Sequence, residues 1–112
     1  MAAMPWLVSD DRVLASVEVA ETPAMRRRGL LRRDAIDGAL FLQPANSVHT
    51  IGMRFAIDVA HLDDESNVLR IVTMRPGRIG RPVPGARAGV EAEAGSFERW
   101  GLSVGDHVEV RR

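Results

Sequence analysis

The sequence contains no cysteine, no lysine and no tyrosine. Without cysteine, the chain cannot form disulfides, thiolate metal sites or cysteine nucleophiles. Without lysine there is no side-chain Schiff base, and without tyrosine there is no phenol to act as an acid. Any catalysis would therefore depend on His, Asp, Glu, Ser, Thr or a bound cofactor, and we expect no cofactor.

Strong charge and long hydrophobic runs are also lacking. The formal net charge is zero at pH 7, which argues against a general affinity for nucleic acid or an anionic membrane. No stretch approaches the ~18–20 apolar residues that cross a bilayer. The start, "MAAMPWLVSDDRV", lacks the basic region of a signal peptide. We therefore expect a soluble, cytoplasmic protein. Its all-arginine basic residues fit a genome that is rich in G and C.

Alternating apolar and polar residues predict several short strands. In "RVLASVEVA" every second residue from Val13 is valine or alanine. In "AGVEAEAG" the alanines and Val90 are expected to face inward, with Glu91 and Glu93 facing outward. Strands are predicted at 12–20, 38–42, 57–63, 68–74 and 88–95. The stretch 104–112 is predicted to be a Gly-Asp turn that leads into a last strand, and 63–67 is predicted to be a hairpin turn.

One short helix and one helical turn complete the predicted elements. Thr22 can cap a helix that begins at Pro23, and Gly29 interrupts or ends it. Ser96 and Gly101 are expected to open and close a helical turn. These elements predict a single domain over 1–112, with its core at about 12–111. Its class is mainly β (α+β): a small, barrel-like antiparallel domain, because closure removes exposed strand edges.

Four motifs, in order, resemble the family called domain of unknown function 192 (DUF192), also known as UPF0127. They are "TPAMRRRGLLRR", "GALF", "SVHTIGMRFAIDVAHLD" and "GVEAEAGSFERWGLSVGD". The resemblance implies a compact, β-rich, barrel-like fold with a helix packed on it, and it implies no established activity. Ala56 stands where relatives usually have proline. The matching positions are Thr22, Arg26, Gly29, Leu30, Arg33, Phe41, His49, Thr50, Met53, Asp58, Glu91, Gly105 and Asp106.

Asp58 is the first candidate for a site. It lies among apolar neighbours of a predicted strand, and a buried carboxylate needs hydrogen bonds or a paired charge. We predict that Arg26 pairs with Asp58 and ties the helix to the sheet. An alternative is a catalytic pocket in which Arg26 holds an anionic ligand and Asp58 orients His49 as a base.

The arginines are the second signal. Arg70, Arg75, Arg78, Arg81 and Arg87 follow one another with no acidic residue among them. In "RPGRIGRPVPG", three of these arginines recur at every third residue and would line one edge of a polyproline-like loop. With Thr50, the arginines at 75, 78 and 81 are candidates to bind a phosphate or an acidic partner. The alternative is a solvated surface.

A metal site is a third possibility. His61 and Asp63 lie two residues apart on one predicted strand, and Asp64 and Glu65 follow. Two such ligands are fewer than a stable site needs, so we expect no metal.

These observations favour a small, non-catalytic binding or accessory module. The alternative is a hydrolase-like acid–base enzyme that uses His49, Asp58 and Arg26. A third class is an anion or nucleic-acid binder that uses the arginine clusters at 26–33 and 70–87. It predicts affinity that falls with added salt. The expected partner is a small anion or an acidic protein. Nucleic acid and membrane are not expected.

Overall fold

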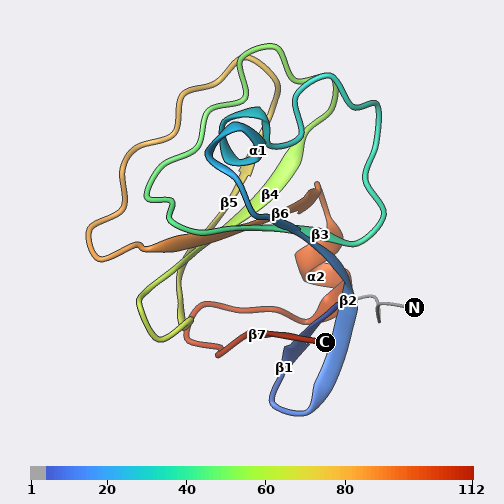
Figure 1. Ribbon diagram of the computed structural model, residues 1–112, viewed down its shortest axis with the longest axis vertical. Coiled ribbons are helices and arrows are strands. Elements are labelled where there is room, and N and C mark those ends of the chain that lie inside the picture. The colour runs from blue at the N-terminus through green and yellow to red at the C-terminus, as the bar shows by residue number, and fades with distance from the viewer. Residues whose placement is uncertain (1–4) are drawn as a thin grey trace.

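The computed structural model of the protein describes residues 5–112. Residues 1–4, part of the start where no signal peptide is predicted, lie outside this description. Within it, the chain forms seven strands and two short helices (Figure 1). In chain order these are β1 (Trp6–Ser9), β2 (Arg12–Ala20), α1 (Pro23–Arg28), β3 (Ala39–Leu42), β4 (Ile57–Leu62), β5 (Val68–Met74), β6 (Ala88–Glu93), α2 (Ser96–Trp100) and β7 (Glu109–Arg111).

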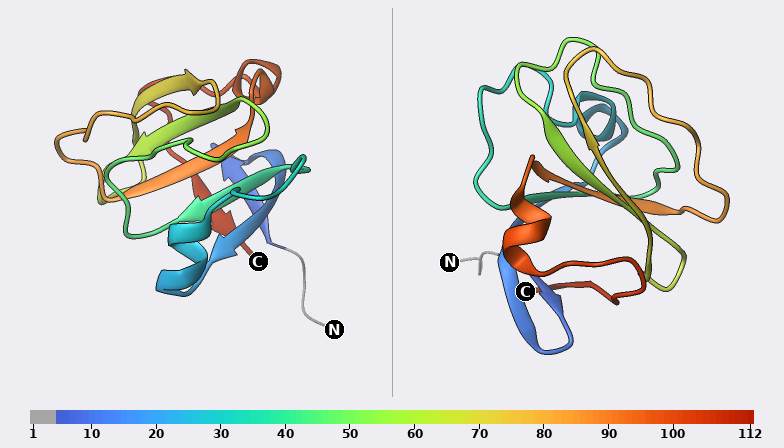
Figure 2. Two further views of the ribbon diagram at one scale, coloured as in Figure 1. Left: turned by 90° about the horizontal axis from the view of Figure 1, so that it is seen from above. Right: turned by 180° about the vertical axis from the view of Figure 1, so that it is seen from behind.

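The strands form one sheet in the order β5-β4-β6-β3-β2-β1-β7. All neighbours are antiparallel except β2 and β3, which run parallel. The sheet curls (Figure 2), and Asn67 and His107 form an isolated bridge that brings its two edges together at one end. The β-rich α+β class is therefore confirmed. The expected barrel is not closed, because β7 has only three residues and pairs only with β1.

Most elements begin and end where the alternation and capping signals predict. β2 and β5 have the predicted bounds. In α1, Thr22 Oγ1 accepts a hydrogen bond from Met25 N at 3.1 Å, and Gly29 follows the helix with a φ of +49°. β1 was missed, because its four residues are too few to show a clear alternation. Neither described helix is long and apolar enough to cross a bilayer.

The sheet has an apolar core on each face. One core includes Leu62, Val90 and Phe97 and packs against α2. The other includes Leu30 and Ile57 and lies on the side of α1. Figures 1 and 2 show the two helices on opposite sides of β3 and β6. Burying one such side chain stabilises the fold by roughly 1.5–3 kcal/mol, and all six residues of β4 are buried. The centre of the sheet therefore has no solvent-facing side.

The predicted ion pair between Arg26 and Asp58 is wrong. Asp58 accepts hydrogen bonds from Thr73 Oγ1 at 2.7 Å, from Gly95 N at 3.0 Å and from Phe97 N at 3.1 Å. It therefore caps the start of α2 from a neighbouring strand, and Ser96, which was expected to open this helix, makes no capping bond. The reason is the strand alternation, which points Asp58 toward α2, whereas Arg26 belongs to the helix on the other face.

Replacing Asp58 with Ala should lower the free energy of unfolding by about 2–4 kcal/mol. The substitution leaves two backbone N–H groups and a threonine hydroxyl without their acceptor, and a buried polar group without a partner costs about 1–3 kcal/mol. Urea denaturation measures the change. Asp58→Asn is the matched control, because its amide can still accept from the backbone and donate to Thr73. If Asp58→Ala lowers the free energy of unfolding no more than Asp58→Asn does, the role of Asp58 as the cap of α2 is contradicted.

Candidate functional site

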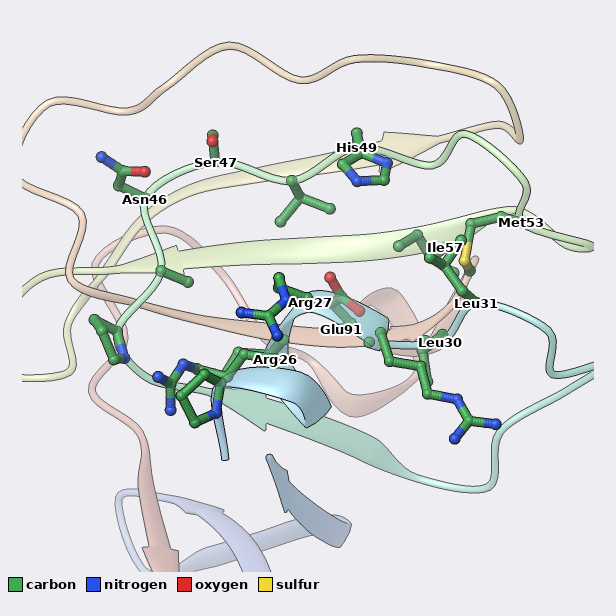
Figure 3. Close-up of a pocket in the computed structure, with 17 residues that line it drawn as sticks. Arg26, Arg27, Leu30, Leu31, Asn46, Ser47, His49, Met53, Ile57 and Glu91 are labelled. Carbon is green, nitrogen blue, oxygen red and sulfur yellow. The ribbon is translucent and has the colours of Figure 1, made fainter. Parts of the chain in front are cut away.

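A cavity of about 480 Å³ opens between α1, the segment 44–49 and one face of the sheet (Figure 3). Apolar walls with a few polar groups are typical of small-molecule sites. The large apolar side chains of the lining are Leu30, Leu31, Leu42, Val48, Met53 and Ile57. The polar and charged lining is Arg26, Arg27, Arg28, Asn46, Ser47, His49 and Glu91.

Glu91 is the buried charged group of this cavity. The residue is only 5% exposed, and Figure 3 shows its carboxyl group among the residues that line the cavity. No residue within 5–112 gives this carboxyl group a hydrogen bond, whereas every fully enclosed side-chain oxygen or nitrogen there has a partner. The oxygens of Glu91 therefore open onto the cavity. Burial raises the pKa of Glu91 from 4.5 to about 7.

The register of the sheet explains the position of Glu91. On β6 it lies opposite Val59 of β4 and Leu40 of β3, so its side chain shares their face. That face is covered by α1, and the end of the helix comes close. A Cβ atom built at Gly29 would lie 3.4 Å from Oε1 of Glu91. The expectation that Glu91 faces solvent is therefore wrong, because both faces of β6 are covered.

The last turn of α1 places positive charge at the cavity. Arg26, Arg27 and Arg28 form this turn, and the first turn contains no acidic residue. Within residues 5–112 none of the three forms an ion pair. The site therefore combines free guanidinium groups with a separate, buried carboxyl group.

His49 and Thr50, adjacent in sequence, have different surroundings. His49 is exposed and lines the cavity. Thr50 is fully buried, and its Oγ1 donates to Arg75 O at 2.6 Å and accepts from Arg78 N at 2.9 Å. The prediction that Thr50 binds a ligand is therefore not supported, because its hydroxyl already holds two backbone groups in place.

Segments 46–50 and 77–83 pair with each other over the sheet, and we call this pair the strap. Gly80 N donates to Val48 O at 2.8 Å, and Thr50 N donates to Arg78 O at 2.7 Å. A Cβ atom at Gly80 would lie 2.6 Å from Val48 O, so only glycine allows this close approach. The first segment lines the cavity of Glu91, and the second lines another cavity.

That second cavity contains the three predicted arginines of the loop. This cavity has a volume of about 310 Å³, and it is lined by Arg75, Arg78 and Arg81. His49 does not line this cavity, so the arginine loop and the segment around His49 border different cavities. The strap divides them, because His49 pairs with Ile79 through the backbone.

The predicted trio of Arg26, His49 and Asp58 does not come together. Arg26 and His49 line the cavity of Glu91, whereas Asp58 lines a different one on the side of α2. Glu91 is the carboxyl group that sequence reasoning missed. Two observations could have indicated it. Glu91 is one of the positions that match the family pattern, and its strand lies between two others at the centre of the sheet, where neither face is exposed to solvent.

No group of three or more possible metal ligands occurs in the part of the chain that the structure describes. His61 lies in the arginine-lined cavity. Asp63 instead closes the hairpin turn, since Oδ1 accepts from Glu65 N and Asn67 N, each at 2.9 Å.

Comparison with known sequences identifies relatives over nearly the whole chain. The family model DUF192, described as uncharacterized ACR, matches residues 6–110. The chain belongs to the DUF192 family. A UPF0127 protein of Pyrococcus abyssi is 32% identical over 98 residues, which are 83% of this chain and 84% of that protein. A UPF0127 protein of Pyrococcus furiosus is 32% identical over 101 residues, which are 86% of this chain and 87% of that protein.

Two crystal structures share the DUF192 fold seen here. A protein of unknown function from Novosphingobium aromaticivorans has a TM-score of 0.77 and 18% identity, over 95% of this chain and 83% of that one. A chain from Sinorhizobium meliloti, provisionally described as a transcription regulator, has a TM-score of 0.70 and 18% identity, over 95% of this chain and 91% of that one. At this identity the likeness shows the fold alone. The family has no assigned function, so function has to be argued from the site.

Replacing Glu91 with Gln should flatten the pH dependence of stability. The pKa of Glu91 is about 7 in the folded chain, whereas a solvent-exposed glutamate, as in the unfolded chain, has a pKa of 4.5. Between these two pH values the folded chain therefore keeps a proton that the unfolded chain loses. The free energy of unfolding of the wild type should therefore fall as pH rises from 4.5 through 7. A pKa shift of this size lowers the free energy of unfolding by roughly 3 kcal/mol above pH 7. Urea denaturation at acidic and alkaline pH measures it.

Glu93→Gln is the matched control, because Glu93 lies on the same strand and is exposed. Its unfolding free energy should follow the wild type at every pH. Equal pH dependence in Glu91→Gln and the wild type would contradict the buried, unpaired state of Glu91.

Proposed function

We propose that this DUF192 protein is a small, non-catalytic ligand-binding module, and that the ligand occupies the cavity of Glu91. The observation that carries the proposal is the buried carboxyl group of Glu91, which has no partner among the described residues and opens onto the cavity. A buried polar group without a partner costs about 1–3 kcal/mol. A ligand that donates a hydrogen bond to Glu91 would remove this cost.

The lining suggests three parts for the ligand. An apolar body would pack against Leu30 and Ile57. A hydrogen-bond donor, such as an ammonium or hydroxyl group, would reach Glu91. An anionic group would meet Arg26 and Arg27 at the last turn of α1, because guanidinium groups pair well with carboxylate and phosphate. A cavity of about 480 Å³ is within the usual range for small-molecule sites.

Acid–base catalysis is a second candidate function, and Glu91 is again the observation that favours it. A carboxyl group with a pKa of about 7 can give and take a proton at neutral pH, and His49 lines the same cavity. We prefer binding, because burial is the only cause of the shifted pKa of Glu91, and no hydrogen bond within residues 5–112 links Glu91 to His49.

Leucyl-leucine should bind in this cavity more tightly than its N-acetyl or C-terminal amide derivative. The dipeptide has the apolar body, the ammonium donor and the carboxylate, and each derivative lacks one charged group. Titration followed by ¹H–¹⁵N NMR should show shifts for the amides of Leu30, Val48 and Glu91. Loss of one charge-assisted contact should weaken binding about tenfold or more.

Two pairs of variants separate the contacts. Glu91→Gln should reduce the preference for the free ammonium group, and Glu93→Gln should not. Arg26→Gln should reduce the preference for the free carboxylate, whereas Arg32→Gln, at an exposed arginine outside the cavity, should not. Equal binding of all three compounds, or shifts confined to other surfaces, would contradict the proposed ligand chemistry.

The cytoplasmic location and the single-domain organisation stay predictions. Fractionation of the native host, followed by immunoblotting, should recover the protein with a cytoplasmic marker. Recovery with the membranes or from outside the cell would contradict the location.

Binding by residues 5–112 alone, as well as by the full chain, is expected if one domain holds the whole site.

A further inference from the structure

The second cavity, of about 310 Å³, gathers basic side chains from two parts of the chain. Its floor is one face of the hairpin of β4 and β5, where His61 and Arg70 lie directly opposite each other. Arg75, Arg78 and Arg81 follow β5 and line the remainder. Thr50 is not in the cavity, but its hydrogen bonds to the backbone of Arg75 and Arg78 hold this segment in place. The arrangement is therefore built by the fold.

The positive charge of this cavity is not balanced by the protein. No acidic residue lines it, and within residues 5–112 none of its four arginines forms an ion pair. Other arginines do have partners, such as Arg33 with Glu18 at 2.6 Å and Arg54 with Asp34 at 2.9 Å. The chain has no net charge, so a general excess of positive charge does not explain the cluster.

His61 adds a buried polar group that points to a ligand. The residue is only 4% exposed and lines the cavity. No residue within 5–112 gives its ring a hydrogen bond. Within residues 5–112, every side-chain nitrogen that is fully enclosed by the protein has a hydrogen-bond partner. Because the ring nitrogens of His61 have none, they are not fully enclosed and open onto the cavity. Burial, and then the positive charge of Arg70, lower the pKa of His61. The imidazole is therefore held neutral and can donate one N–H.

We propose that this cavity binds a small molecule that carries two or more phosphoryl groups. Each guanidinium can donate two parallel hydrogen bonds to phosphate oxygens, and four such groups exceed what one phosphoryl group can use. The small volume of the cavity, about 310 Å³, and the zero net charge of the chain favour a small molecule over a nucleic acid, which needs an extended basic surface. The proposal is independent of the ligand of Glu91, because the strap separates the two cavities.

Inorganic pyrophosphate is the probe, measured by isothermal titration calorimetry at fixed, low ionic strength. It should bind about tenfold or more tightly than orthophosphate or sulfate, because each extra charged hydrogen bond adds at least about that factor. The ring nitrogen resonances of His61 should shift on binding. The amide of Glu91 should not shift, which keeps this test separate from that of the other cavity.

Arg70→Gln and Arg78→Gln should each weaken pyrophosphate binding about tenfold. Arg87→Gln is the matched control, because Arg87 is exposed, belongs to the same acid-free run and does not line this cavity. Without probe, the melting temperature of Arg70→Gln should equal or exceed that of the wild type, because one repelling charge is removed. A lower melting temperature together with weaker binding would instead make Arg70 structural and overturn the proposal.

Three further outcomes decide the ligand class. Tighter binding of ADP or of a sugar bisphosphate than of pyrophosphate would support the proposal and identify the organic part. Equal affinity for pyrophosphate and sulfate would overturn it, because the cluster would then attract anions without a fitted site. Tighter binding of a single-stranded oligonucleotide than of any small phosphate would also overturn it, in favour of a nucleic-acid surface.

Discussion

Burial of β4 on both faces is the constraint on which the rest of the structure depends. Its alternation sends Asp58 toward α2 and His61 toward the opposite face, and neither side offers bulk water. Each polar group at the centre of the sheet must therefore find a protein partner or open onto a cavity. Asp58 finds three donors and holds α2 in place. Glu91 and His61 have no hydrogen-bond partner within residues 5–112, so burying them lowers the stability of the fold without a compensating interaction.

The strap separates the two cavities onto which these unpaired groups open. Its backbone pairing, fixed by the hydroxyl of Thr50 and the close approach at Gly80, covers the face of the sheet that carries Glu91 and His61. The cavity of Glu91 lies toward α1, and the cavity of His61 lies over β4 and β5. Both cavities are shaped by the protein chain alone, which would lower the ordering cost of binding a ligand. They differ in charge, with a buried carboxyl group in one and only basic groups in the other.

The sequence predicts the strands better than it predicts what covers them. Alternation placed β2 and β5 correctly, and Thr22 with Pro23 located the start of α1. The same alternation grouped Asp58 with Ala60 and Leu62, which the register confirms. It could not show that α1 packs on the other face, so Arg26 was assigned to the wrong partner. For Glu91 the alternation was right and the conclusion wrong, because a period of two says which residues share a face and not whether that face meets water.

The cost of leaving Glu91 unpaired supports a functional origin for it. A rise in pKa from 4.5 to about 7 means roughly 3 kcal/mol of lost stability once the group ionises, against a typical total of about 5–15 kcal/mol for a domain. Glutamine or leucine at this position would avoid that loss without changing the strand. Local features that oppose stability without compensation are characteristic of functional sites, where the missing interaction is supplied by a ligand. Asp58 shows the contrast, because an equally buried carboxyl group with three donors needs no ligand to explain it.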